Sequence, residues 1–296
     1  MATISSRYFS APDGLRLHVL EAGPRDGDRL PAICLPGLAR TAEDFRELIE
    51  ALAFDRDNPR RVLALDSRGR GLSAHDPDPV NYSVPVELGD VLALLDAHGI
   101  GRAVFIGTSR GGILTMSLGA ARPRAIAGAV LNDIGPVLEM TGLLRIKSYV
   151  GRLPKPANHA EAIELLRAVM GSQFPALDAA AWDLYVRRTW REVEGQGLVP
   201  WYDVAISKTL ETIDPGERPA PLWPQFDALA HAPIMVVRGE HTDLLSRETV
   251  AAMRARRPDL EFVEIPGQGH APLLTGPETI APIVKFAARC DSQIVV

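Results

Sequence analysis

The sequence predicts an α/β protein with a mostly parallel sheet of eight strands and helices on both faces. Over the first 135 residues, short apolar segments of strand length alternate with longer segments of helix length. The alternation stops near residue 136 and resumes near residue 231. Parallel strands need crossover helices between them, so this alternation is typical of a parallel sheet covered on both sides.

The chain opens with a predicted β-hairpin. Residues 4–10 and Leu15–Glu21 flank the tripeptide Pro12-Asp13-Gly14, and proline, aspartate and glycine are the residues that tight turns prefer. In the second strand His18 alternates with apolar neighbours. We therefore expect His18 to be an ordinary strand residue without a chemical role.

The next strand is predicted at residues 31–35, where the chain is apolar. It opens through Pro36-Gly37 into a helix expected over Ala42–Ala53. Thr41 stands just before that helix and is a good N-cap residue.

A further strand at residues 61–66 leads into the glycine-rich loop Ser67–Ser73. Neither of the common glycine-rich phosphate-binding patterns occurs in this loop, so we interpret it as a structural turn. An amphipathic helix is expected over Val86–His98, and the glycine that follows is a usual helix-ending residue.

The centre of the sequence is a strand, a sharp turn with a serine, and a helix. A buried strand over Ala103–Ile106 runs into the pattern G-x-S-x-G at Gly107–Gly111, and a helix is expected over Ile113–Ala121. A serine on such a turn has a strained backbone, and its flanking glycines let the strand and the helix approach closely. The strand Ile126–Leu131 follows. Because the pattern lies between a strand and a helix, it favours a nucleophilic role for Ser109.

The chain beyond residue 231 continues the sheet. Strands are predicted at residues 232–239 and at Leu260–Ile265. Helices are predicted over Thr249–Arg256, with Ser246 as its cap, and over Glu278–Ala288.

The middle of the chain has a different character. Residues 136–230 lack strand patterns and contain all four tryptophans of the chain. Helix-length segments occur there at residues 140–150, 160–170, 177–194 and 200–210. We predict a core of residues 1–135 and 231–296 and a helical lid of residues 136–230 whose aromatic side chains cover a pocket. Alternatively, these aromatics only pack the helices together.

Composition excludes several function classes. The net charge is −5, with no long block of one sign, which favours neither nucleic acid nor an anionic membrane as a partner. Two cysteines, Cys34 in an apolar strand and Cys290 near the end, make a poor disulfide pair. No leader-like or membrane-spanning segment is recognised. We expect a cytoplasmic, soluble protein, monomeric or homodimeric, without cofactor or metal, since no histidines form a helical metal-binding pair.

Three polar residues follow predicted strands at the same edge of the sheet. Ser109, Asp243 and His270 occur in that order in the chain. Loops after the carboxyl ends of parallel strands emerge on one edge, where ligands bind. A serine hydroxyl needs an adjacent base, and a carboxylate must hold an imidazole base in the right tautomer. The three side chains are therefore predicted to converge.

The sequence resembles the α/β-hydrolase superfamily over nearly its whole length. The resemblance is carried by the Ser109 turn, the loop Asp66–Ser73, the segment Arg238–Asp243 and the tetrapeptide Gly269–Pro272. It implies an α/β-hydrolase fold with Ser109 as nucleophile, His270 as general base and then acid, and Asp243 as the orienting carboxylate.

The resemblance also implies an oxyanion hole made by the backbone N–H groups of Leu38 and Arg110. The family often has His-Gly where this chain has Pro36-Gly37. Because the donors are backbone groups, we expect the hole to be retained.

Other residues compete for the role of the acid. Asp133 also follows a predicted strand, and some relatives place the acid there. Glu240 and His241 share the loop of Asp243, but Glu240 lies nearer the strand end and is expected to cap backbone groups. We prefer Asp243 because its loop resembles the acid loop of the family.

A serine nucleophile predicts hydrolysis of a small carboxylic ester through an acyl-enzyme, with bulky or polyester substrates also permitted by an aromatic lid. Lactone opening, carbon–carbon bond hydrolysis and cofactor-free perhydrolysis use the same three residues. A non-catalytic ligand-binding receptor of this fold is a hypothesis of another class.

Overall fold

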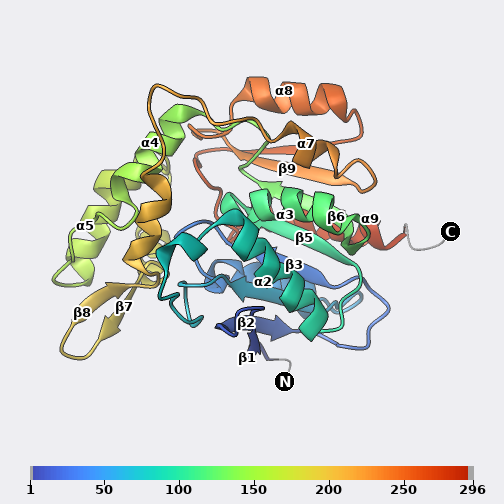
Figure 1. Ribbon diagram of the computed structural model, residues 1–296, viewed down its shortest axis with the longest axis horizontal. Helices are drawn as coiled ribbons and strands as arrows, with labels where there is room; N and C mark the ends of the chain where they lie inside the picture. The colour runs from blue at the N-terminus through green and yellow to red at the C-terminus, as the bar shows by residue number, and fades with distance from the viewer. Residues whose placement is uncertain (1–2, 293–296) are drawn as a thin grey trace.

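The computed structural model describes residues 3–292, and its centre is one twisted sheet of eight strands (Figure 1). In spatial order the strands are β1 (Ser5–Ser10), β2 (Arg16–Ala22), β4 (Val62–Asp66), β3 (Ala32–Leu35), β5 (Ala103–Thr108), β6 (Ile126–Asn132), β9 (Ile234–Gly239) and β10 (Glu261–Ile265). β2 pairs antiparallel with β1 and β4, and every other pairing in this sheet is parallel. The predicted mostly parallel sheet of eight strands is confirmed.

Helices cover both faces of the sheet. One face packs against α2 (Val84–Ala97), α3 (Arg110–Ala121) and α8 (Arg247–Arg256), and the other against α1 (Arg46–Ala53) and α9 (Pro277–Asp291). Successive side chains of a strand point to opposite faces. Accordingly, Phe105 of β5 joins the first cluster and Ile106 joins the second. Strands buried on both faces explain why the predicted strands are continuous apolar runs.

The segment between β6 and β9 is mainly helical. Its elements up to residue 210 lie to one side of the sheet, whereas its last helix packs against α3 (Figure 1). Its elements are α4 (Met140–Tyr149), α5 (His159–Met170), α6 (Ala179–Arg187), β7 (Trp190–Val193), β8 (Gly197–Pro200), a 3₁₀ helix (Val204–Leu210) and α7 (Trp223–Asp227). The helix expected over residues 177–194 is wrong in its second half, because a hairpin replaces it there. Gly195 and Gly197 have positive φ angles of 73° and 69° and make the tight turn of that hairpin.

The inserted segment has a small apolar core of its own. Trp182, Trp190, Leu166 and Phe174 belong to this cluster. These two tryptophans therefore pack the inserted helices together, as the alternative interpretation expected. The boundaries at residues 136 and 230, and the role of the segment as a lid, stay predictions.

One edge of the insert is joined to the core through backbone hydrogen bonds. The N–H of Gly71 donates to the carbonyl of Trp201, and the N–H of Asp203 donates to the carbonyl of Gly69, each at 2.7 Å. Arg70 and Tyr202 form an antiparallel bridge between these two bonds. The loop Ser67–Ser73 is thus one part of the core to which the main chain of the insert is bonded. A second is the segment after β9, where the carbonyls of Leu244 and Asp243 accept from the N–H groups of Glu139 and Gly142 at 3.0 Å.

Some local expectations need revision. Thr41 makes no side-chain cap, and a short 3₁₀ helix (Ala42–Phe45) precedes α1. Ser246 does cap α8, by accepting from the N–H of Thr249. Cys34 and Cys290 are both free and buried, and burial raises the pKa of the Cys290 thiol to about 12. Within residues 3–292, no helix is both long enough and apolar enough to span a membrane.

Candidate active site

Ser109 lies on the sharp turn between β5 and α3. Its φ angle of 51° is in the left-handed region, which a non-glycine residue adopts at a cost. A Cβ on Gly107 would lie 2.5 Å from the backbone of Gly111, and one on Gly111 would overlap the carbonyl of Leu35. Both flanking residues must therefore be glycine for the strand and the helix to meet at this turn.

His270 follows β10 and reaches across to the serine. Its Nε2 lies 2.9 Å from Oγ of Ser109, within hydrogen-bond distance. The ring is buried, and the backbone N–H of His270 donates to the side chain of Gln173, a residue of the insert, at 2.8 Å. His270 is thus held by the core through Ser109 and by the insert through Gln173.

Asp133 supplies the carboxylate next to this imidazole. Its Oδ2 lies 2.7 Å from Nδ1 of His270, and its Oδ1 accepts from the N–H of Gly239 at 2.9 Å. The hydroxyl of Thr242 donates to Oδ2 at 2.5 Å. Asp133 has a φ angle of 54°, and among residues 3–292 it shares a positive φ with only one other non-glycine residue, Ser109. Strained backbone of this kind is typical of functional positions.

Asp243, the predicted acid, is placed elsewhere and this expectation is corrected. Both its carboxylate oxygens accept from Arg145 of α4, at 2.6 and 2.8 Å. Asp243 lies four residues beyond the end of β9, whereas Asp133 follows directly after β6, the neighbour of the strand that leads to Ser109. Glu240 accepts from the N–H of Gly267 at 2.8 Å, which confirms its expected capping of backbone groups.

The two expected oxyanion donors both belong to residues close to the serine. Arg110 is the first residue of α3, so its N–H is at a helix N-terminus, where the peptide dipoles favour negative charge. Leu38 lies in the loop after β3, and a Cβ on the neighbouring Gly37 would be 3.8 Å from Cβ of Ser109. The carbonyl of Leu38 accepts from Nε of Arg70 at 2.7 Å, which fixes the orientation of this loop.

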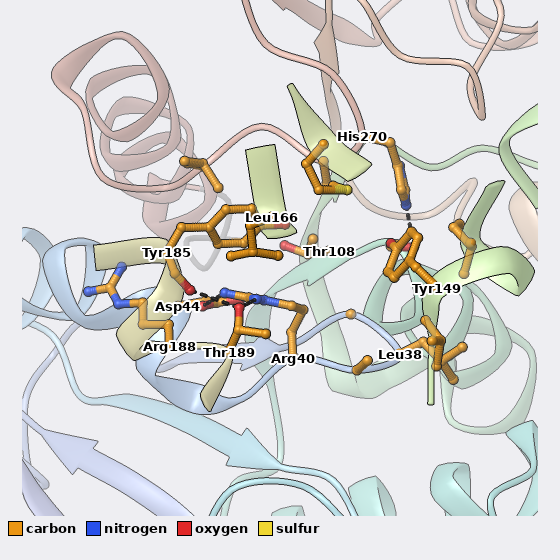
Figure 2. Close-up of a pocket in the computed structure, with 18 of the residues that line it drawn as sticks. Leu38, Arg40, Asp44, Thr108, Tyr149, Leu166, Tyr185, Arg188, Thr189 and His270 are labelled. Carbon is orange, nitrogen blue, oxygen red and sulfur yellow. Dashed lines mark hydrogen bonds and ion pairs between the residues drawn. The ribbon is translucent and has the colours of Figure 1, made fainter. Parts of the chain in front are cut away.

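A pocket opens next to Ser109 and His270. The cavity has a volume of about 130 Å³. Its apolar wall comes mainly from the insert and includes Ile146, Leu153, Leu166, Val169 and Leu184. Figure 2 shows a polar end, where Arg40 lies with Asp44 and Thr189, apart from His270, Tyr149 and Leu38. Arg40 makes two bonds of 2.7 Å to Asp44 and one of 2.8 Å to Thr189.

The loop Ser67–Ser73 carries two buried arginines, Arg68 and Arg70. Arg68 pairs with Asp90 and Asp76, at 2.6 and 2.5 Å. Arg70 pairs with Glu87 of α2 at 2.7 Å, and Glu87 also accepts from Arg110 at 2.7 Å. Burial would raise the pKa of Glu87, but the two guanidinium groups hold it below its usual value. Glu87 was not among the predicted site residues, although it is a carboxylate on the apolar side of a predicted helix.

Among residues 3–292, no three or more His, Cys, Asp and Glu side chains are grouped so that they could hold a metal ion.

Comparison with known proteins agrees with the fold. A profile described as the alpha/beta hydrolase family matches residues 32–283. A 3-hydroxybutyrate-oligomer hydrolase from Cupriavidus necator is 33% identical over 270 residues, which cover 86% of this chain and 87% of that protein. A 2-(acetamidomethylene)succinate hydrolase from Mesorhizobium japonicum is 28% identical, covering 76% of this chain and 77% of its own.

A solved structure is similar over almost the whole molecule. The crystal structure of an alpha/beta hydrolase from Novosphingobium aromaticivorans is 42% identical, with a TM-score of 0.90. The match covers 98% of this chain and 99% of that one. The profile match, these relatives and the architecture of the sheet together show that the chain is a hydrolase belonging to the alpha/beta hydrolase family.

Proposed function

We propose that this hydrolase is a serine esterase that works through an acyl-enzyme, with Ser109 as nucleophile, His270 as base and Asp133 as orienting acid. The observation that carries the proposal is the continuous chain of hydrogen bonds from Ser109 Oγ to His270 Nε2 at 2.9 Å and from His270 Nδ1 to Asp133 Oδ2 at 2.7 Å. This order of contacts is what a serine nucleophile requires.

The proposed reaction has two halves. In the first, Nε2 of His270 takes the proton of Ser109 while Oγ attacks the ester carbonyl, and the N–H groups of Leu38 and Arg110 stabilise the oxyanion. His270 then gives that proton to the leaving alcohol. In the second half, His270 takes a proton from water, the hydroxide attacks the acyl-enzyme, and Ser109 leaves with the proton returned.

The proposed substrates are esters of short acyl chains that carry a second polar group. The cavity of about 130 Å³ is smaller than most ligand pockets, which favours a short acyl group. The polar end at Arg40 and Thr189 offers hydrogen bonds to a hydroxyl or a carbonyl beyond the acyl carbon. The relative from Cupriavidus necator is named for the hydrolysis of 3-hydroxybutyrate oligomers, which are esters of a short acid that carries a second oxygen group.

The insert is proposed to act as a lid over this pocket. Its support is that the apolar wall next to Ser109 is built largely from the insert. Removal of that wall would expose the acyl group and the serine to bulk water.

The test compares wild type and Ser109→Ala on p-nitrophenyl acetate, p-nitrophenyl butyrate, a 3-hydroxybutyrate dimer and a lactone. Turnover of the esters that is lost in the variant supports the esterase, together with phosphonate labelling of Ser109 by mass spectrometry. Faster turnover of the lactone would favour a lactonase instead. No turnover of any substrate above that of the variant would favour a ligand-binding receptor.

A further inference from the structure

Glu87 is linked to both residues of the proposed oxyanion hole, directly to Arg110 and through Arg70 to Leu38. It lies on α2, and its side chain is 1% exposed. Oε1 accepts from Nη1 of Arg70 and Oε2 accepts from Nε of Arg110, both at 2.7 Å. One buried carboxylate therefore holds two guanidinium groups in fixed positions.

Each guanidinium leads to one backbone donor of the hole. Nε of Arg70 donates to the carbonyl of Leu38 at 2.7 Å, so Arg70 fixes the peptide that follows the first donor. Arg110 itself carries the second donor, and its Nη2 also donates to the carbonyl of Tyr82 at 3.2 Å. The path from Leu38 to the N-terminus of α3 thus runs through Arg70, Glu87 and Arg110 without a gap.

The energetic cost of this group indicates a role beyond stability. Two guanidinium groups share a single carboxylate, and Nη2 of Arg70 is buried without a hydrogen-bond partner. Burying an incompletely satisfied cation costs free energy, so a purely stabilising core would more simply be apolar at this place. Donors fixed in advance around developing negative charge are what lowers the barrier in acyl transfer.

We propose that Glu87 is a positioning residue that sets the distance and angle between the Leu38 and Arg110 backbone donors. The proposal rests on the proposed esterase function. Glu87 touches no reacting atom, and its effect reaches the transition state through the two arginines alone.

The chain offers a matched control on the same helix. Asp90 lies one turn further along α2, is equally buried, and pairs with Arg68 through two bonds of 2.6 and 2.7 Å. Asp90→Asn and Glu87→Gln each remove one carboxylate charge from a buried pair with arginine. Only Glu87 contacts Arg110 and the arginine that holds Leu38.

The experiment measures kcat and KM for p-nitrophenyl butyrate and the affinity for a trifluoromethyl ketone that forms a tetrahedral adduct with serine. We expect Glu87→Gln to lower kcat roughly 10- to 100-fold, since loss of a whole donor costs about 10²- to 10³-fold. KM should change less than about twofold, and the affinity for the ketone should fall in parallel with kcat. Asp90→Asn should lower the melting temperature but change kcat less than about threefold.

Several outcomes would overturn the proposal. These are a wild-type or raised kcat in Glu87→Gln, an equal loss of kcat in both variants, or a loss that appears in KM alone. If Glu87→Gln does not fold, Arg110→Met removes one arm of the bridge at a partly exposed side chain, and the same pattern of kcat and ketone affinity is expected. Failure of the esterase itself is recognised separately, because wild type would then match Ser109→Ala.

Discussion

Oδ2 of Asp133 lies 2.7 Å from Nδ1 of His270, while the carboxylate of Asp243 is paired with Arg145. β6, which ends just before Asp133, lies beside β5 in the sheet, and β5 leads to Ser109. The acid and the nucleophile therefore come from adjacent strand ends, and the imidazole arrives from β10 at the edge of the sheet.

This arrangement predicts that two similar substitutions lower kcat to very different extents. Asp133→Asn should lower kcat for p-nitrophenyl butyrate by about 10³- to 10⁴-fold, because the imidazole loses its orienting carboxylate and takes the wrong tautomer. Asp243→Asn, the matched control, should stay within about tenfold of wild type. Steady-state kinetics and circular dichroism of both variants test this. A larger loss in Asp243→Asn than in Asp133→Asn would restore Asp243 as the acid.

The close approach at the Ser109 turn predicts a stability difference between two glycines. A Cβ on Gly111 overlaps the carbonyl of Leu35, whereas one on Gly101 has no neighbour within 4 Å. Gly111→Ala should lower the free energy of unfolding by about 1–3 kcal/mol and reduce activity, because β3 and α3 must move apart. Gly101→Ala should stay within about 0.5 kcal/mol of wild type. Urea unfolding measures both, and equal stability of the two variants would contradict the argument.

The pocket wall predicts which residue limits acyl length. Leu153 lines the cavity and belongs to the insert, while Leu177 packs on the same small core without lining the cavity. Leu153→Ala should raise the ratio of kcat/KM for p-nitrophenyl octanoate over butyrate by roughly tenfold, the usual range for a hydrophobic pocket that gains space. Leu177→Ala serves as the control for lost packing. An unchanged ratio in Leu153→Ala would place the acyl group elsewhere.

The buried His98 is expected to make the folded protein less stable at acidic pH. Burial lowers the pKa of His98 from its usual 6.5, and the nearby Arg61 lowers it as well. The Nδ1 of His98 lies 3.1 Å from Nη2 of Arg61, a contact that needs the neutral ring as acceptor. Because the unfolded ring binds its proton at higher pH than the folded one, this stability is present above about pH 6.5. It is lost as the pH falls through the folded pKa.

His98→Asn keeps an acceptor but removes the titration. The free energy of unfolding, measured with urea between pH 7.5 and pH 5, should therefore fall less steeply in the variant than in wild type. Equal slopes in the two proteins would exclude His98 as a contributor.

The sequence predicted what depends on local pattern. The alternation of strands and helices and the glycine spacing around Ser109 are properties of neighbouring residues, and the sheet is observed as expected. The choice between Asp133 and Asp243 was not local. It depends on Arg145, which lies 98 residues from Asp243 in the chain and meets it only after α4 has packed on the sheet edge. A carboxylate directly after the strand next to the nucleophile strand was the available signal.

The insert was less predictable for a related reason. The chain after Arg187 leaves its helix because Trp190 packs into the small core beside Trp182 and two glycines permit a tight turn. Side-chain periodicity alone does not distinguish that hairpin from a continued helix. Glu87 had a local signal, a carboxylate on the buried side of α2, but its partners come from two distant segments of the chain.

The short ladder between residues 69–71 and 201–203 is one place where main-chain hydrogen bonds join the insert to the core. Another lies at the start of α4, where the N–H groups of Glu139 and Gly142 donate to the carbonyls of Leu244 and Asp243, each at 3.0 Å. Elsewhere the insert is tied by side-chain pairs such as Arg188 with Glu47 and Arg40 with Thr189. Because Arg70 lies in the ladder with residues 201–203 and also donates to the carbonyl of Leu38, any displacement of the insert at residues 201–203 would be transmitted to the loop that carries one proposed oxyanion donor.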